Sequence, residues 1–164
     1  MVVGIDADVH RIAYAVMDAG VVRAVATIER ANHVGRIDER YDQQLTALMR
    51  NAQAYGATLL IEGIYLAEAR RGEASTRNVQ GFARMSEVHG EIKREARRHG
   101  VPWETVSPNT WHSKVLGFTR GRDELKAAAQ AKARELTEQE LTEHEADAVC
   151  VALCGAWQPT EPPT

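Results

Sequence analysis

Three short apolar runs joined by tight turns occupy the first 28 residues, and they restrict the fold more than any other feature of the chain. The runs are VVGID at 2–6, RIAYAVMD at 11–18 and VVRAVATI at 21–28, and the last two meet at an Ala-Gly turn. Short β-branched runs separated by turn residues are typical of hairpin strands. The sequence therefore predicts a three-stranded antiparallel meander at residues 2–28.

Strands and helices alternate after the meander. Apolar residues at three- and four-residue steps predict a helix over about 37–55, and ATLLIEG at 57–63 predicts a buried strand after it. A helix over 76–99, which Gly90 can interrupt, and a strand over 101–106 follow. This order predicts an α/β fold, with a five-stranded mixed sheet flanked by helices on both faces.

Three helices are expected near the C-terminal end of the sequence. Ser107 and Pro108 have the N-cap and N1 order of a short helix that ends at Gly117. Helices over about 122–136 and 142–157 follow, and the Pro-rich segment 158–164 is predicted to be disordered. Since 164 residues with 44% hydrophobic content bury one substantial core, we expect residues 1–157 to form a single domain.

The start of the sequence and its cysteines indicate the cellular compartment. The chain begins with an alternating apolar pattern, without a basic leader or a long apolar run, so neither secretion nor a membrane partner is expected. Cys150 and Cys154 lie four residues apart in an apolar helical run, which favours a buried reduced pair over a metal site or a disulfide. We therefore expect a cytoplasmic protein.

Two carboxylates end otherwise apolar strands. Asp6 ends the first strand, with Asp8 on the same side by two-residue periodicity, and Glu62 ends the fourth. An Asp at a strand end often only caps a turn, and this alternative stays open for Asp6. A second buried carboxylate is costly without a compensating cation, so the two acids together favour a shared ion.

The predicted last helix adds two more candidate ligands. His144 and Asp147 are three residues apart and share a helical face, just after the capping-box pair Thr142 and Glu145. Glu143 and Glu145 are explained as charges at the positive end of the helix dipole. Asp147 lies beyond that turn, where the helix becomes apolar, so it faces either the core or a bound ion.

Carboxylates from separate elements suit a hard cation. Oxygen-rich sites favour Mg²⁺ or Mn²⁺, and two such ions about 3.5 to 4 Å apart support in-line phosphodiester cleavage. Zinc is disfavoured because His144 has no second His or Cys at ligand spacing.

Charge is distributed unevenly along the chain. The formal net charge is −3, yet residues 70–134 hold 14 Lys and Arg against 7 Asp and Glu. A single basic run such as the one at 93–98 is most simply a solvated helix face. Together with the acidic residues above, the basic middle of the chain favours contact with nucleic-acid phosphates.

Four segments resemble the RuvC family of Holliday-junction resolvases, within the RNase H-like superfamily, and the resemblance extends over nearly all of residues 1–157. The segments are GIDADVHRIAYAVMD, LLIEGIYL, GFARMSEVHGEI and HEADAVCVALCGAW. The resemblance implies an RNase H-like fold in which Asp6, Glu62, His144 and Asp147 occupy the four metal-site positions. His144 stands where some members have Asp.

A fifth segment, SPNTWHSKVLGFTRGRDELKAAAQ, resembles more loosely the basic stretch before the last helix of the family. The resemblance implies that Lys126 approaches the substrate backbone with the catalytic residues, while His112 and Lys114 compete for an earlier lysine position. Tyr65 falls where the family has an aromatic that stacks on a base, although ordinary packing explains it equally well. The expected DNA contacts are Tyr65, Arg70, Arg71, Arg77, Arg84, His112, Lys114, Arg120, Arg122 and Lys126.

The resemblance also implies an activity and an assembly. A homodimer with one Mg²⁺- or Mn²⁺-dependent site per subunit would nick two symmetric strands of a four-way DNA junction. The alternatives are another RNase H-like nuclease, acting on RNA-DNA hybrid or branched DNA, and a non-catalytic junction-binding module.

Overall fold

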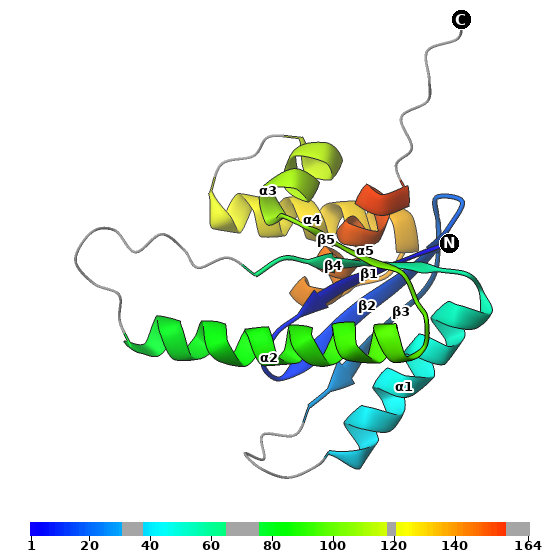
Figure 1. The fold of residues 1–164 in the computed structure, drawn as a ribbon. Helices are drawn as coiled ribbons and strands as arrows, with labels where there is room; N and C mark the ends of the chain where they lie inside the picture. Colours follow the sequence, from blue (N-terminus) through cyan, green and yellow to red (C-terminus); the bar gives the residue numbers. More distant parts are fainter. Residues whose placement is uncertain (31–37, 65–75, 118–120, 157–164) are drawn as a thin grey trace, which may run out of the picture.

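The structure is a computed structural model that describes residues 1–30, 38–64, 76–117 and 121–156, with the backbone alone at 76–78. Five strands form one mixed sheet in the order β3-β2-β1-β4-β5 (Figure 1). The strands are β1 Val2–Ala7, β2 Arg11–Asp18, β3 Val21–Glu29, β4 Thr58–Glu62 and β5 Trp103–Val106. β1, β2 and β3 pair antiparallel, which confirms the predicted meander, and β1, β4 and β5 pair parallel.

Helices cover both faces of the sheet, as predicted (Figure 1). They are α1 Glu39–Ala54, α2 Thr76–Arg98, α3 Pro108–Trp111, the π-helix η1 His112–Leu116, α4 Arg122–Thr137 and α5 Glu143–Ala156. α2 continues through Gly90 without a break, because the other residues of its middle section favour helix and the glycine has open space around it. Ser107 caps α3 with Pro108 at N1, and Gly117, at φ 74°, ends η1.

Alternation along each strand sends successive side chains to two different cores. Ile5 and Ile61 pack with α1 and α2 on one face. On the other face, Ala13 and Ala15 of β2 pack with α5, and Leu60 of β4 packs with α3, α4 and α5. The two faces therefore carry separate hydrophobic cores, with β1 at the centre of the sheet between them.

Gly4 in β1 allows α5 to approach the sheet at backbone contact distance. A Cβ built on Gly4 would lie 2.3 Å from the Ala148 carbonyl oxygen and 2.3 Å from the Ala152 nitrogen. Since any side chain here would collide with helix backbone, glycine is required for this helix-strand contact. The contact fixes the depth at which α5 lies against the strand that ends in Asp6.

The buried cysteines agree with the sequence analysis. Cys150 and Cys154 are both free and buried, and the Cys150 thiol lies 3.8 Å from the Ala129 carbonyl oxygen of α4. Within the described ranges, the helices are all too short or too polar to cross a lipid bilayer.

Candidate metal centre

Neighbouring strand ends bring Asp6 and Glu62 to one edge of the sheet. The last registered pair of the parallel strands β1 and β4 is Ile5 with Ile61, and the two acids come one residue later on each strand. Both acids follow a residue that faces α1 and α2, so both point to the opposite face, toward α3 and α5. The predicted convergence of these carboxylates is therefore a direct consequence of strand register.

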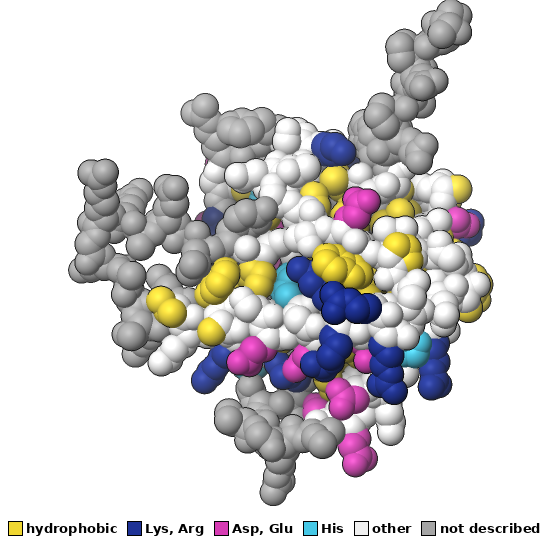
Figure 2. All heavy atoms as spheres, viewed as in Figure 1, with side chains coloured by type: hydrophobic (Ala, Val, Ile, Leu, Met, Phe, Trp, Pro, Cys, Tyr) yellow, Lys and Arg dark blue, Asp and Glu magenta, His cyan; other side chains and the backbone are white. Residues whose placement is uncertain are grey.

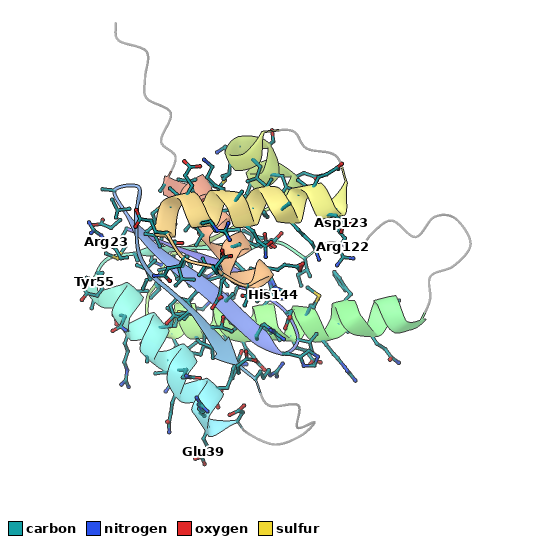
Figure 3. All side chains as sticks on the ribbon, turned by 180° about the vertical axis from the view of Figure 1, so that it is seen from behind. Arg23, Glu39, Tyr55, Arg122, Asp123 and His144 are labelled. Carbon is teal, nitrogen blue, oxygen red and sulfur yellow. The ribbon has the colours of Figure 1, made fainter. Side chains whose placement is uncertain are left out.

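The first turns of α5 face the same edge. Gly4 contacts the helix around Ala148 and Ala152, and Asp6, two residues farther along the same strand face, meets His144 one turn earlier in the helix. Glu145 closes the capping box that begins the helix, accepting from the Thr142 backbone N–H at 3.0 Å. Figure 3 shows His144 at the start of α5.

His144 lies between two carboxylates of the β1–β2 region. Its Nδ1 is 2.6 Å from Asp6 Oδ2, and its Nε2 is 3.2 Å from Asp8 Oδ2. The hydrogen bond with Asp6, together with the charges of both acids, outweighs burial and raises the pKa of His144. This arrangement favours an imidazolium that donates from both ring nitrogens.

Asp8 is held rigidly by its own turn. Its Oδ1 accepts hydrogen bonds from the backbone N–H groups of His10 at 2.6 Å and Arg11 at 2.9 Å. Its Oδ2 faces His144 and, at 3.5 Å, the Arg11 guanidinium. Asp8 is therefore a fifth polar residue of the cluster that Asp6, Glu62, His144 and Asp147 form.

Glu62 is the most strongly perturbed acid of the cluster. Burial, the nearby charges of Asp6 and Asp147, and a hydrogen bond shared with Asp6 raise its pKa to about 9, although donation from Trp111 opposes the shift. The Trp111 indole nitrogen donates to Glu62 Oε1 at 3.1 Å. Burial and the neighbouring carboxylates therefore disfavour the charged form of Glu62 while no cation is bound.

The pKa of Asp147 is raised for similar reasons. Burial and the charge of Asp6 raise its pKa to about 7, while His144 and Lys126 act in the opposite direction. The cluster thus contains two acids whose ionisation is resisted mainly by burial and by a shared neighbour, Asp6. A bound cation would relieve both effects.

The donor chemistry fits Mg²⁺ or Mn²⁺, since four carboxylates dominate the cluster and zinc-type thiolate ligands lie elsewhere on α5. Within the described part of the chain, however, no three His, Cys, Asp or Glu side chains are already arranged to hold an ion. The bonds from Asp6 to His144 and to Glu62 occupy oxygens that an ion would need. Side-chain rotation that opens these bonds is therefore a condition for binding.

Lys126 of α4 reaches the first turn of α5. Its ammonium forms an ion pair with Glu143, the residue before His144, and this pair lowers the pKa of Glu143. Glu143, interpreted from sequence as a helix-start charge alone, therefore also anchors the lysine. The pair brings one predicted substrate contact next to the acidic cluster.

The other predicted DNA contacts divide into two groups. Tyr65, Arg70, Arg71 and Arg120 lie outside the described residues, as does the side chain of Arg77. Arg84, Lys114 and Arg122 are exposed, and Figure 3 shows Arg122 at the start of α4. His112 is half-buried, and burial lowers its pKa, so it offers a neutral N–H rather than a positive charge.

The basic run in the C-terminal half of α2 is not a uniformly basic surface. Figure 2 shows Lys and Arg side chains intermingled with acidic ones on this face. The ammonium of Lys93 lies 5.0 Å from the Trp103 ring centroid, and Arg98 lies 3.8 Å from Glu95. The simpler interpretation of this run, a solvated helix face, fits the observed contacts.

Two residues of the cluster were absent from the predicted site. Two-residue periodicity placed Asp8 on the Asp6 side but gave no reason to link it with His144. Trp111 has no periodic or motif signal, because its contact with Glu62 spans 49 residues.

Comparison with solved structures finds the same fold elsewhere. The chain superposes on the structure of RuvC from Thermus thermophilus with a TM-score of 0.62 and 16% identity, over 94% of this chain and 92% of the other. It superposes on T. thermophilus RuvC in complex with Holliday junction substrate with a TM-score of 0.64 and 14% identity, over 94% and 91%. No protein-family model and no curated protein sequence matches the chain. The chain therefore has the RNase H-like fold of RuvC.

Proposed function

We propose that this chain is a Mg²⁺- or Mn²⁺-dependent endodeoxyribonuclease that resolves four-way DNA junctions by paired symmetric nicks. The observation that carries the proposal is the convergence of Asp6, Glu62 and Asp147 at one sheet edge, where burial and mutual repulsion raise the pKa of the last two. The junction substrate is proposed from the shared fold, because one of the matching RuvC structures is a complex with a Holliday junction.

In this proposal Asp6, Glu62 and Asp147 hold the metal together with His144, whose imidazole must first lose its proton and its hydrogen bond with Asp6. Bound ions of this kind activate water and stabilise the leaving oxygen in phosphodiester hydrolysis. The residues of the chain orient the ligands: Asp8 holds His144, and the paired Lys126 and Glu143 lie at the same helix end. Lys126 is proposed to exchange Glu143 for a substrate phosphate, since both partners are anionic oxygens.

A homodimer is part of the proposal. Two equivalent sites related by two-fold symmetry match a substrate that is itself nearly two-fold symmetric, and each subunit then cuts one strand. A dimeric mass in solution is expected.

One experiment tests substrate and chemistry together. The purified protein is incubated with a labelled four-way junction, an RNA-DNA hybrid and a linear duplex, each with Mg²⁺, with Mn²⁺ and with chelator. We expect symmetric nicks in the junction only, and only with metal. Preferential cutting of the hybrid would instead assign another nuclease activity to the same acids, and tight junction binding without nicking would assign a binding module.

A further inference from the structure

Trp111 is an unusual neighbour for a site carboxylate because it belongs to the core. It is 1% exposed and is the largest fully buried side chain among the described residues. It packs in the hydrophobic cluster formed by Leu60, Val106, Val115, Ala129, Cys150, Val151 and Cys154. A ring enclosed in this way on β4, β5, α4 and α5 has little freedom to rotate.

The polar edge of that ring points at the site. The indole nitrogen donates to Glu62 Oε1 at 3.1 Å, and a buried indole N–H requires an acceptor. Since the ring is fixed by packing on all sides, the Glu62 carboxylate takes its orientation from the ring. The donor holds Oε1 of Glu62, and the same carboxyl group also shares a hydrogen bond with Asp6 that must open before an ion can bind.

We propose that Trp111 is a positioning residue for Glu62, fixing one carboxylate oxygen so that the other is directed to a metal ion shared with Asp6 and Asp147. The inference rests on the proposed function, because it takes Glu62 as a metal ligand. Hydrogen-bond donors behind ligating carboxylates orient the ligand and tune its affinity for the ion.

The same ring also borders the segment that follows it. Trp111 and His112 meet edge to face, with ring centroids 4.0 Å apart and an interplanar angle of 66°. His112 begins the π-helix η1, an irregular element that is frequent at functional sites. Trp111 therefore connects the ligand Glu62 to the segment that carries His112 and Lys114, two of the predicted DNA contacts.

Substitution by phenylalanine separates positioning from packing. Trp111→Phe keeps an aromatic ring in the core and removes the N–H donor. Trp103→Phe is the matched control, since Trp103 lies in β5 with its ring under Lys93. The affinity of each DNA-free protein for Mn²⁺ alone is measured by calorimetry, beside the thermal unfolding midpoint in chelator.

We expect Trp111→Phe to weaken Mn²⁺ binding by about tenfold or more, and Trp103→Phe to leave it unchanged. A merely structural role would lower the thermal unfolding midpoint of Trp111→Phe and leave Mn²⁺ affinity at the wild-type value. That result would overturn this inference and leave the proposed function standing. Failure of the wild-type protein to bind Mn²⁺ would overturn the proposed function and the inference with it.

A second measurement needs no change at position 111. The chain has three tryptophans, so its indole N–H groups give few nuclear magnetic resonance signals, and Phe replacements at 103 and 157 identify the third by elimination. We expect the Trp111 signal to shift as Mg²⁺ is added to the wild-type protein. A signal that stays in place while Mg²⁺ binds contradicts the inference, even where Trp111→Phe fails to fold.

Discussion

His144 and Asp6 lie 138 residues apart in the sequence, yet the Nδ1 of the histidine is 2.6 Å from the Oδ2 of the aspartate. This hydrogen bond joins the first turn of α5 to the end of the central strand. Asp8 Oδ2 lies 3.2 Å from the other ring nitrogen, so the histidine bridges two acids whose proximity raises its pKa. A metal ion entering the cluster would compete with it for the same oxygens.

Replacement of His144 by Asp tests whether its role is ligation. We expect His144→Asp to retain substantial nicking and to lose much of the dependence on pH between about 6.5 and 8, because the raised pKa of His144 places imidazolium deprotonation above about 6.5 and a carboxylate needs none. Nicking rates across that range are the measurement, with His144→Ala as the variant that supplies no ligand. An inactive but folded and metal-saturated Asp variant would argue for proton transfer by the histidine.

Replacing a single metal-binding acid by its amide should abolish DNA nicking and preserve binding to the junction. We expect Asp6→Asn and Asp147→Asn to abolish Mg²⁺-supported nicking while junction affinity stays within about tenfold, because each change removes an ion ligand without adding volume. Asp18→Asn is the control and should remain active, because Asp18 lies at the end of β2 that is farther from Asp6. Near wild-type nicking by Asp6→Asn or Asp147→Asn at saturating metal would exclude that residue as a ligand.

The raised pKa values of Glu62 and Asp147 predict how metal-free stability depends on pH. An acid whose pKa is higher in the folded state stabilises the fold below its unfolded pKa, and this stability is lost as pH rises through the folded value. With folded pKa values of about 9 and about 7, the thermal unfolding midpoint in chelator should decrease as pH rises from about 5 to about 9. Glu62→Gln should flatten the decline, and Mg²⁺ should reverse it in the wild-type protein. A wild-type midpoint that is constant or rises over this range is the contrary result.

Lys126 should contribute one phosphate contact. Each neutralised phosphate adds a slope of about −0.9 to the logarithmic salt dependence on duplex DNA, so Lys126→Ala should flatten that dependence by about one unit. Lys132→Ala is a close control, because Lys132 is on the same helix and is also paired with a glutamate, Glu135, at 2.6 Å. An unchanged slope with normal affinity removes Lys126 from the DNA contacts, whereas an unchanged slope with lost nicking assigns it to catalysis.

The contact between Gly4 and α5 predicts a destabilised variant. Gly4→Ala places a Cβ against helix backbone and should destabilise the fold by about 1–3 kcal/mol or more, since backbone cannot repack as a side chain does. Gly90→Ala, in an exposed helical position with open space, should be neutral or stabilising by about 0.5–1 kcal/mol. Denaturant unfolding of both variants measures their free energies of unfolding. Equal values for Gly4→Ala and Gly90→Ala would show that α5 moves away from β1 at little cost.

The fold and the acidic residues were accessible from sequence because both depend on local periodicity. Two-residue alternation fixes the side to which Asp6 and Glu62 point, and a three-residue step fixes the shared face of His144 and Asp147. Other contacts at the site join residues from distant segments, and no local sequence periodicity predicts them. Trp111 reaches Glu62 only because α3 folds back over the end of β4, and Lys126 reaches Glu143 because two helices pack side by side.

The close packing of α5 on β1 has a consequence for protein synthesis. Asp6 leaves the ribosome well before its partner His144 on α5, which lies 138 residues later in the sequence. A domain forms its long-range contacts only when both segments are available. A partly synthesised chain therefore lacks His144 and Asp147 beside Asp6, and the proposed cutting activity can arise only once α5 has been translated and has docked on Gly4.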